Sequence, residues 1–286
     1  MAATNRQAGV GMTLIGTAAP AGTAAPRDAS AAASSSSPPP TPPGAPRSRA
    51  RRALRWTAAA VSVLAVVGAG GFGVLWTATP SVADAPVRVA AILAAHHDRS
   101  DNGVVATKVA AAVLATEDSR FYRDPALDPA GTARAAWGLV THNPDEGGAT
   151  IEIQLAKLLY TGGRSGLADQ VEQVALAFKL DSHFTKAQLL AMYLDAAYFG
   201  DGAYGITAAA DRYFGLRPDR LSWAQASLLA GLLQAPSAYD PHRHFRAALA
   251  RQQDVLDRLV ATGTLSRAQA DQVGHAPLRP IIAFGG

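Results

Sequence analysis

An uncharged run of 23 residues, WTAAAVSVLAVVGAGGFGVLWTA at Trp56–Ala78, constrains the fold of this chain more than any other feature. As a helix it would be about 34 Å long at about 1.5 Å per residue, which is enough to cross the hydrocarbon core of a bilayer. A tryptophan lies at or near each end, as is typical of helices that meet membrane–water interfaces. The run therefore predicts one transmembrane helix over 56–78 in preference to a buried core helix.

The charges on either side of this run predict its orientation. The basic juxtamembrane segment RSRARRALR at 47–55 carries five arginines, whereas Asp84 and Arg88 are the first charged residues beyond the other end. By the positive-inside rule the N-terminus is cytoplasmic, and the arginines lie against anionic lipid headgroups. We therefore expect a single-pass plasma-membrane protein with an extracytoplasmic domain. The alternative is a signal peptide cleaved after Ala83, although a leader of 55 residues before the apolar run is long for one.

The rest of the chain divides into a tail and one domain. Residues 1–46, which include AAASSSSPPPTPPGAP, bury too little apolar surface to offset the entropy of ordering, so we expect a disordered cytoplasmic tail. The whole chain has a net charge of +4, but residues 1–78, with seven Arg and one Asp, carry +6. Residues 84–286 are predicted to form one slightly acidic extracytoplasmic domain.

This domain is predicted to be mainly α. Apolar residues recur at helical spacing in six stretches, from VATKVAAAVLATED to FRAALARQQDVLDRLVATG, and no stretch alternates with the period of a strand. The sequence also excludes several functions. It has no cysteine for a thiolate site, no SxxK for an acyl-serine transpeptidase, and no basic domain surface for nucleic acid. The histidines of AAHHDRS and PHRHFR lack the spacing of metal ligands and are interpreted as solvated loop residues.

A resemblance to a known family covers roughly residues 106–241 and is carried by four motifs. They are, in order, ATEDSRFYRDPALDPAG, GGATIEIQLAKLLY, YLDAAYFGDGAYGITAAADRYFG and LSWAQASLLAGLLQAPSAYDP. They resemble the peptidoglycan glycosyltransferase domain (glycosyltransferase family 51) of class A penicillin-binding proteins and monofunctional transglycosylases. The resemblance implies a lysozyme-like helical domain beside the membrane that polymerises lipid II, the lipid-linked disaccharide-peptide precursor, by inverting transfer. Any transpeptidase that works with it is then a separate protein.

The first motif places two carboxylates, Glu117 and Asp118, at the end of an apolar helix. Sugar transfer from a polyprenyl diphosphate to an acceptor hydroxyl needs a base for the hydroxyl proton and cations for the departing diphosphate. Glu117 suits the base, because partial burial raises the pKa of a carboxyl group toward the working pH. Asp118 is expected to orient this base or to face a divalent cation, Mg²⁺ or Mn²⁺.

The second motif is expected to meet the diphosphate. Helical steps of about 100° place Thr150, Gln154 and Lys157 on one polar stripe beside an apolar arc. A helix entered through glycines can present amide donors, a hydroxyl and an ammonium to a phosphate. The alternative is an ordinary amphipathic helix with solvated polar residues.

The resemblance implies further substrate-binding residues in and beside these motifs: Phe121, Gly148, Tyr198 and Gly205. Tyr198, Phe199 and Tyr204 can stack on sugar faces, but aromatic residues beside glycines are as often packing anchors, and both interpretations stay open.

The chain departs from the family most clearly in the third motif. The family has Arg-Lys and then a second functional Glu, whereas the matching residues here are Asp169, Gln170 and Gln173. Glu172 precedes Gln173, turned about 100° around the helix, and is the expected substitute if a bulge or a slip brings it into place. We therefore count Glu172 and Gln173, with Glu117, as catalytic candidates. Smaller departures are Asp124, Ala149, Ile153, Asp195 and Gln225.

Three functions follow from this pattern. The favoured one is a monofunctional peptidoglycan glycosyltransferase that acts on lipid II and the growing glycan strand. The second is a peptidoglycan-binding scaffold of the same fold that has lost turnover, because Gln173 replaces a functional Glu. The third is a glycan-cleaving lysozyme-like enzyme, against which the apolar run and the polar stripe both count.

Overall fold

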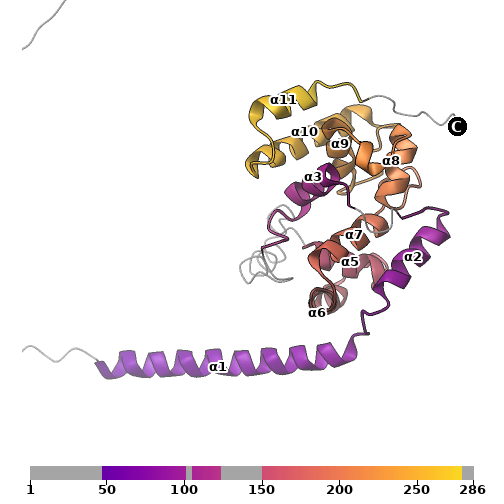
Figure 1. The fold of residues 1–286 in the computed structure, drawn as a ribbon. Coiled ribbons are helices and arrows are strands. Elements are labelled where there is room, and N and C mark those ends of the chain that lie inside the picture. Colours follow the sequence, from indigo (N-terminus) through magenta and orange to yellow (C-terminus); the bar gives the residue numbers. More distant parts are fainter. Residues whose placement is uncertain (1–46, 101–104, 124–149, 279–286) are drawn as a thin grey trace, which may run out of the picture. The chain divides into compact units, whose positions relative to one another are not determined.

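The regular structure of this protein is helical (Figure 1). The computed structural model describes residues 47–100, 105–123 and 150–278. Within these ranges there is no strand, and an isolated antiparallel bridge joins Tyr198 to Tyr204. The mainly α class predicted from the periodicity is therefore confirmed. The predicted tail at 1–46 lies outside the described residues.

The basic segment and the uncharged run form one continuous helix, α1, at Arg47–Ala78. It ends just before Pro80, as expected because proline disfavours helical backbone in the residue before it. In the parts of the chain that the structure describes, no helix combines the length and the apolar character needed to cross a membrane.

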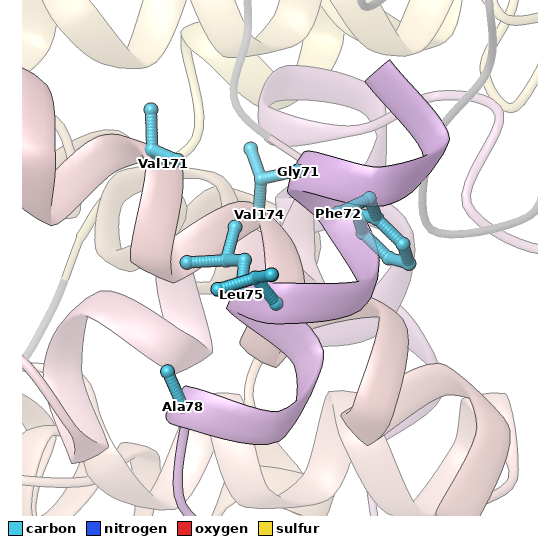
Figure 2. Close-up of a pocket in the computed structure, with 7 residues that line it drawn as sticks. Gly71, Phe72, Leu75, Ala78, Val171 and Val174 are labelled. Atoms are coloured by element: carbon cyan, nitrogen blue, oxygen red, sulfur yellow. The ribbon is translucent and has the colours of Figure 1, made fainter. Parts of the chain in front are cut away.

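The last turns of α1 pack against α6, Leu167–His183. The rings of Phe72 and Phe178 meet edge to face, with their centroids 5.3 Å apart. Next to this contact lies an open apolar groove, and Figure 2 shows its lining side chains from both helices. The groove is lined by Gly71, Phe72, Val74, Leu75, Ala78, Val171 and Val174.

The domain contains two groups of packed helices. In the first group α5 packs against α6 and α7, and α2 packs against α7 and α5. In the second group α9 lies against α3, α10 and α11, and α8 contacts both α7 and α9. The bounds are α2 Ala85–Ala95, α3 Thr107–Glu117, α5 Ile151–Leu159, α7 Lys186–Ala196, α8 Ile206–Phe214, a 3₁₀ turn η2 Pro218–Arg220, α9 Trp223–Leu232, α10 Phe245–Ala261 and α11 Arg267–Gly274.

Helix α9 is the centre of the second group. Its residues from Ala224 to Leu232 are all buried, which suits a helix that is apolar on every side. The helix begins with a capping box, in which Gln225 accepts a 2.9 Å hydrogen bond from the backbone N–H of Ser222. Gln225, one of the residues that depart from the family pattern, therefore caps the start of α9.

The two groups meet where the first two sequence motifs lie. Helix α3, from the second group, ends at Glu117, and α5, from the first group, begins just after Thr150. The fold thus brings together the end of α3 and the start of α5, which are more than 30 residues apart in the sequence. The candidate site is built around this junction.

Candidate active site

A chain of hydrogen bonds links three helices at the junction. The side-chain amide of Gln154 on α5 donates to Oε2 of Glu117 at the end of α3, over 3.0 Å. The phenol of Tyr193 on α7 donates to the other end of the same amide, Oε1 of Gln154, over 2.8 Å. Among the described residues, Gln154 is the one hydrogen-bond partner of the Glu117 side chain. The carboxylate thus keeps accepting capacity for an incoming hydroxyl proton.

Asp118 holds the start of α5. Its Oδ2 accepts a 3.3 Å hydrogen bond from the backbone N–H of Ile151, at the N-terminus of that helix. Burial raises the pKa of Asp118, and the negative charge of Glu152 adds to this, while hydrogen bonds from backbone N–H groups and the charge of Lys186 oppose it. Asp118 thus links the end of α3 to the first turn of α5, while its predicted role of orienting Glu117 stays a prediction.

The polar stripe predicted on the second motif is present at α5. Thr150 is the N-cap of the helix, and its hydroxyl accepts from the backbone N–H of Ile153. Gln154 follows one turn later, and Lys157 lies in the last turn, partly exposed. In the described part of the chain no carboxylate pairs with the ammonium of Lys157. This cation is therefore available to an anionic ligand.

A buried ion pair also holds α5 against α7. The carboxylate of Glu152 is only 1% exposed and lies 2.6 Å from the ammonium of Lys186, the first residue of α7. Lys186 also lies 2.9 Å from Asp181 on α6 and 4.8 Å from the ring centroid of Phe121. Burial lowers the pKa of Lys186, but its hydrogen bonds to the two carboxylates outweigh that effect, so the pKa is raised. Phe121, predicted to bind substrate, is buried in this arrangement.

The third-motif candidates lie away from this hydrogen-bond chain. Gln173 is buried, and its amide nitrogen donates to Oγ1 of Thr161 over 2.7 Å and to the backbone carbonyl of Arg164 over 2.8 Å. These bonds fix the connection between α5 and α6. Glu172 is partly exposed, and the described residues show no contact between it and Glu117. A catalytic role for either residue stays a prediction.

The aromatic motif after α7 forms a tight turn. Phe199 is fully buried and so acts as a packing anchor, whereas Tyr198 is half-buried and its hydroxyl accepts from the backbone N–H of Gly202. Gly205 has a φ of +84°, and a Cβ there would lie 3.0 Å from the backbone oxygen of Asp195. Gly205 is thus required by the turn itself. Gly148, the remaining substrate-binding candidate, lies outside the described residues, as do Asp124 and Ala149.

The expected divalent cation finds no ready ligand set among the described residues. No group of three or more His, Asp or Glu side chains converges there. Asp118, the predicted ligand, instead receives a backbone N–H. No described residue is therefore assigned as a metal ligand.

The family is decided by a sequence profile. The profile described as transglycosylase matches residues 89–260, which include α3, α5, α7 and α9. The chain belongs to the transglycosylase family. The resemblance drawn from the motifs is confirmed, and with it the class of enzyme, a glycosyltransferase of peptidoglycan.

Relatives in the transglycosylase family include proteins of different length. One is a Cupriavidus necator protein that is named as a transglycosylase. It is 35% identical over 177 residues, which make up 62% of this chain and 77% of the relative. Another is penicillin-binding protein 1A of Escherichia coli, 36% identical over 179 residues, 60% of this chain and 21% of the relative. The chain thus spans about a fifth of the length of that penicillin-binding protein.

A solved structure also matches part of the chain. It is penicillin-binding protein 1A from Haemophilus influenzae, with 24% identity and a TM-score of 0.31 over 45% of this chain and 16% of that one.

Sequence reasoning did not identify Tyr193 or Lys186 as members of this transglycosylase site. Both act through partners on α5 that lie more than 30 residues earlier in the sequence. A signal was present for Tyr193, because a tyrosine that is buried among apolar residues needs a partner for its hydroxyl.

Proposed function

We propose that this protein polymerises lipid II into glycan strands, with Glu117 as the base that takes the proton of the acceptor sugar hydroxyl. The observation that supports this most strongly is the hydrogen bond from Gln154 to Glu117. The amide donor fixes the direction of the carboxylate, which a general base needs. The carboxylate also keeps accepting capacity toward the substrate.

The leaving diphosphate is assigned to the polar stripe of α5. Lys157 supplies a positive charge that no described carboxylate neutralises, in the last turn of the helix. Charge that develops on a departing diphosphate is stabilised most by a cation already held in place. Thr150 already caps the helix, so we assign its hydroxyl a structural role that also fixes the first turn facing the substrate.

The replaced third motif supports a second candidate function. Asp169 and Gln170 carry no positive charge, and Asp169 pairs with Arg164 at 2.9 Å. Without these two cations and the carboxylate of the third motif, the site could still bind peptidoglycan precursors but would turn them over more slowly. A scaffold of the same fold is therefore the second candidate, and the transfer reaction remains the first because Glu117 and Lys157 are both in place.

We also propose that α1 anchors the domain to the plasma membrane, with residues 1–55 cytoplasmic. The support is the sequence of the helix, in which 23 consecutive residues are uncharged and five arginines precede them. The rest of the domain would then lie at the outer surface, where lipid II and a separate transpeptidase are accessible. A mature N-terminus at Asp84, found by mass spectrometry of the purified protein, would contradict this anchor.

The deciding experiment is incubation of the purified full chain with lipid II and a divalent cation. New glycan polymer supports the transfer reaction. Binding of lipid II without polymer supports the scaffold. Cleavage of preformed glycan without polymer would overturn both in favour of a lysozyme-like hydrolase.

A further inference from the structure

We propose that Tyr193 is a positioning residue of this site: its phenol fixes the side-chain amide of Gln154 so that the NH₂ group faces Glu117. The inference rests on the proposed role of Glu117 as the base. It adds a residue on α7 that does not touch the reacting atoms and acts through Gln154.

The direction of the amide follows from donors and acceptors. The oxygen of a glutamine amide only accepts hydrogen bonds, and its nitrogen only donates them. Tyr193 contacts the oxygen over 2.8 Å, and Glu117 contacts the nitrogen over 3.0 Å. The opposite orientation would place the amide oxygen against the carboxylate, so that two acceptors would face each other without a hydrogen.

The phenol can serve as a constant donor. Tyr193 is 3% exposed, and burial together with the negative charge of Glu117 raises its pKa well above the ordinary value. The hydroxyl therefore keeps its proton throughout the working pH range. The acceptor-only carboxylate of Glu117 selects the NH₂ group, and the neutral phenol holds the amide oxygen at the other end, so the amide is fixed from both sides.

The ring is also held in place relative to α5. Lys186 and Tyr193 are seven residues apart, two helical turns, and so share one face of α7. Lys186 binds Glu152, and Tyr193 binds Gln154 two residues further along α5. The two helices are neighbours in Figure 1 and pack together along this face. Two attachment points leave the phenol little freedom to move away from the amide.

The consequence is a base that is pre-oriented. With the phenol present, Gln154 presents its NH₂ group to Glu117 in the free enzyme, so no reorganisation is needed when the acceptor hydroxyl arrives. Without the phenol, the amide can rotate and Glu117 loses its fixed donor. The rate of transfer should fall, while substrate affinity should stay nearly unchanged, because the buried side chain of Tyr193 offers almost no surface to a ligand.

A double-mutant cycle tests this. In the full chain, Tyr193→Phe should lower kcat for lipid II by about tenfold with little change in KM. Gln154→Ala should lower it at least as much, and adding Tyr193→Phe to Gln154→Ala should change kcat by less than about twofold, because the two residues act as one unit. The control is Tyr213→Phe, another buried tyrosine, whose hydroxyl donates to the backbone oxygen of Phe199. This variant should keep kcat.

The amide itself provides a readout that does not depend on activity. In ¹⁵N-glutamine-labelled protein, the NH₂ signals of Gln154 should shift in both Tyr193→Phe and Glu117→Gln and stay unchanged in Tyr213→Phe. Unchanged signals in Tyr193→Phe, or equal losses of kcat in the wild-type and Gln154→Ala backgrounds, would overturn the positioning role. If the wild type makes no polymer, the proposed function fails, and the NMR signals still decide whether Tyr193 orients Gln154.

Discussion

The ammonium of Lys186 at the start of α7 lies 2.6 Å from the buried carboxylate of Glu152 in the first turn of α5. Lys186→Met should destabilise the protein by roughly 3–5 kcal/mol, because it leaves a buried charge without its partner. The double variant Lys186→Met/Glu152→Met should recover most of that loss. Thermal or denaturant unfolding of the full chain measures both.

A surface pair provides the control for this prediction. Arg267 and Asp257 also form an ion pair, but about half of each side chain is exposed, at 56% and 50%. Arg267→Met should therefore change the free energy of unfolding far less than Lys186→Met does, because water screens an exposed pair. If Lys186→Met and Arg267→Met lost similar amounts of stability, the burial of Glu152 would not add to the cost of breaking its ion pair.

Gln173→Glu should destabilise the fold. The amide nitrogen of Gln173 donates to Thr161 and to the carbonyl of Arg164, and a carboxylate would place an acceptor against that carbonyl. The expected loss is about 1–3 kcal/mol at neutral pH, measured by thermal unfolding. Gln170→Glu makes the same change at an exposed contact, where the amide donates to the carbonyl of Ser165 and water can replace it, so this variant should lose less stability. Equal melting temperatures for both variants would remove the structural role assigned to Gln173.

Activity of third-motif variants separates the remaining hypotheses. If Glu172 replaces the family's second functional Glu, Glu172→Gln should reduce turnover about as much as Glu117→Gln. If the site is short of a carboxylate at Gln173, Gln173→Glu should raise turnover in whatever fraction of the protein stays folded. Rates are therefore normalised to folded protein, and no change in either variant would assign the role to neither residue.

Asp118 predicts a pH dependence of stability. Its folded-state pKa is raised above 3.8, so the folded state holds the proton more tightly than the unfolded state does. Well below pH 3.8 the carboxyl group is protonated in both states and does not change the free energy of unfolding. As the pH rises through the folded-state pKa, the wild type should lose stability relative to Asp118→Asn, and the difference should then level off. Melting temperatures of both proteins from acid to neutral pH measure this, and a difference that shrinks as pH rises would contradict it.

Lys157 is predicted to act through its charge. Lys157→Ala should lower kcat/KM for lipid II by more than Lys157→Arg does, because the developing charge of the diphosphate needs a cation rather than one particular side chain. Steady-state rates with the two variants provide the comparison. Small and equal effects would indicate a solvated lysine.

Helix boundaries were the part of the fold most accessible from the sequence. The glycines and the apolar arc of the second motif predicted a helix, and α5 begins right after Thr150, with Ile151 and Leu155 fully buried. Local spacing was sufficient there, because every residue involved lies within three turns of the others. The same logic located Glu117 at the end of an apolar helix, where α3 ends.

Tertiary partners could not be predicted in the same way. Glu152 lies next to the polar stripe in sequence, yet it is buried, because Lys186 reaches it from a helix 34 residues later. The resemblance implied that Gln173 stands where the family has a functional Glu, but spacing could not show that Thr161 and Arg164 would bind its amide. Such contacts depend on how α5, α6 and α7 pack, which no local period encodes.

The most direct test of the proposed mechanism is the rate of glycan polymerisation from lipid II by the wild type and Glu117→Gln. The wild type should form polymer, and the variant should be slower by about 10²–10⁴, because it lacks the base for the acceptor hydroxyl. Its melting temperature should be nearly unchanged, since a glutamine oxygen can still accept from Gln154. Asp211→Asn, which removes an exposed carboxylate on α8, is the control and should keep full activity. A loss of less than about tenfold in Glu117→Gln would contradict the assignment of Glu117 as the base.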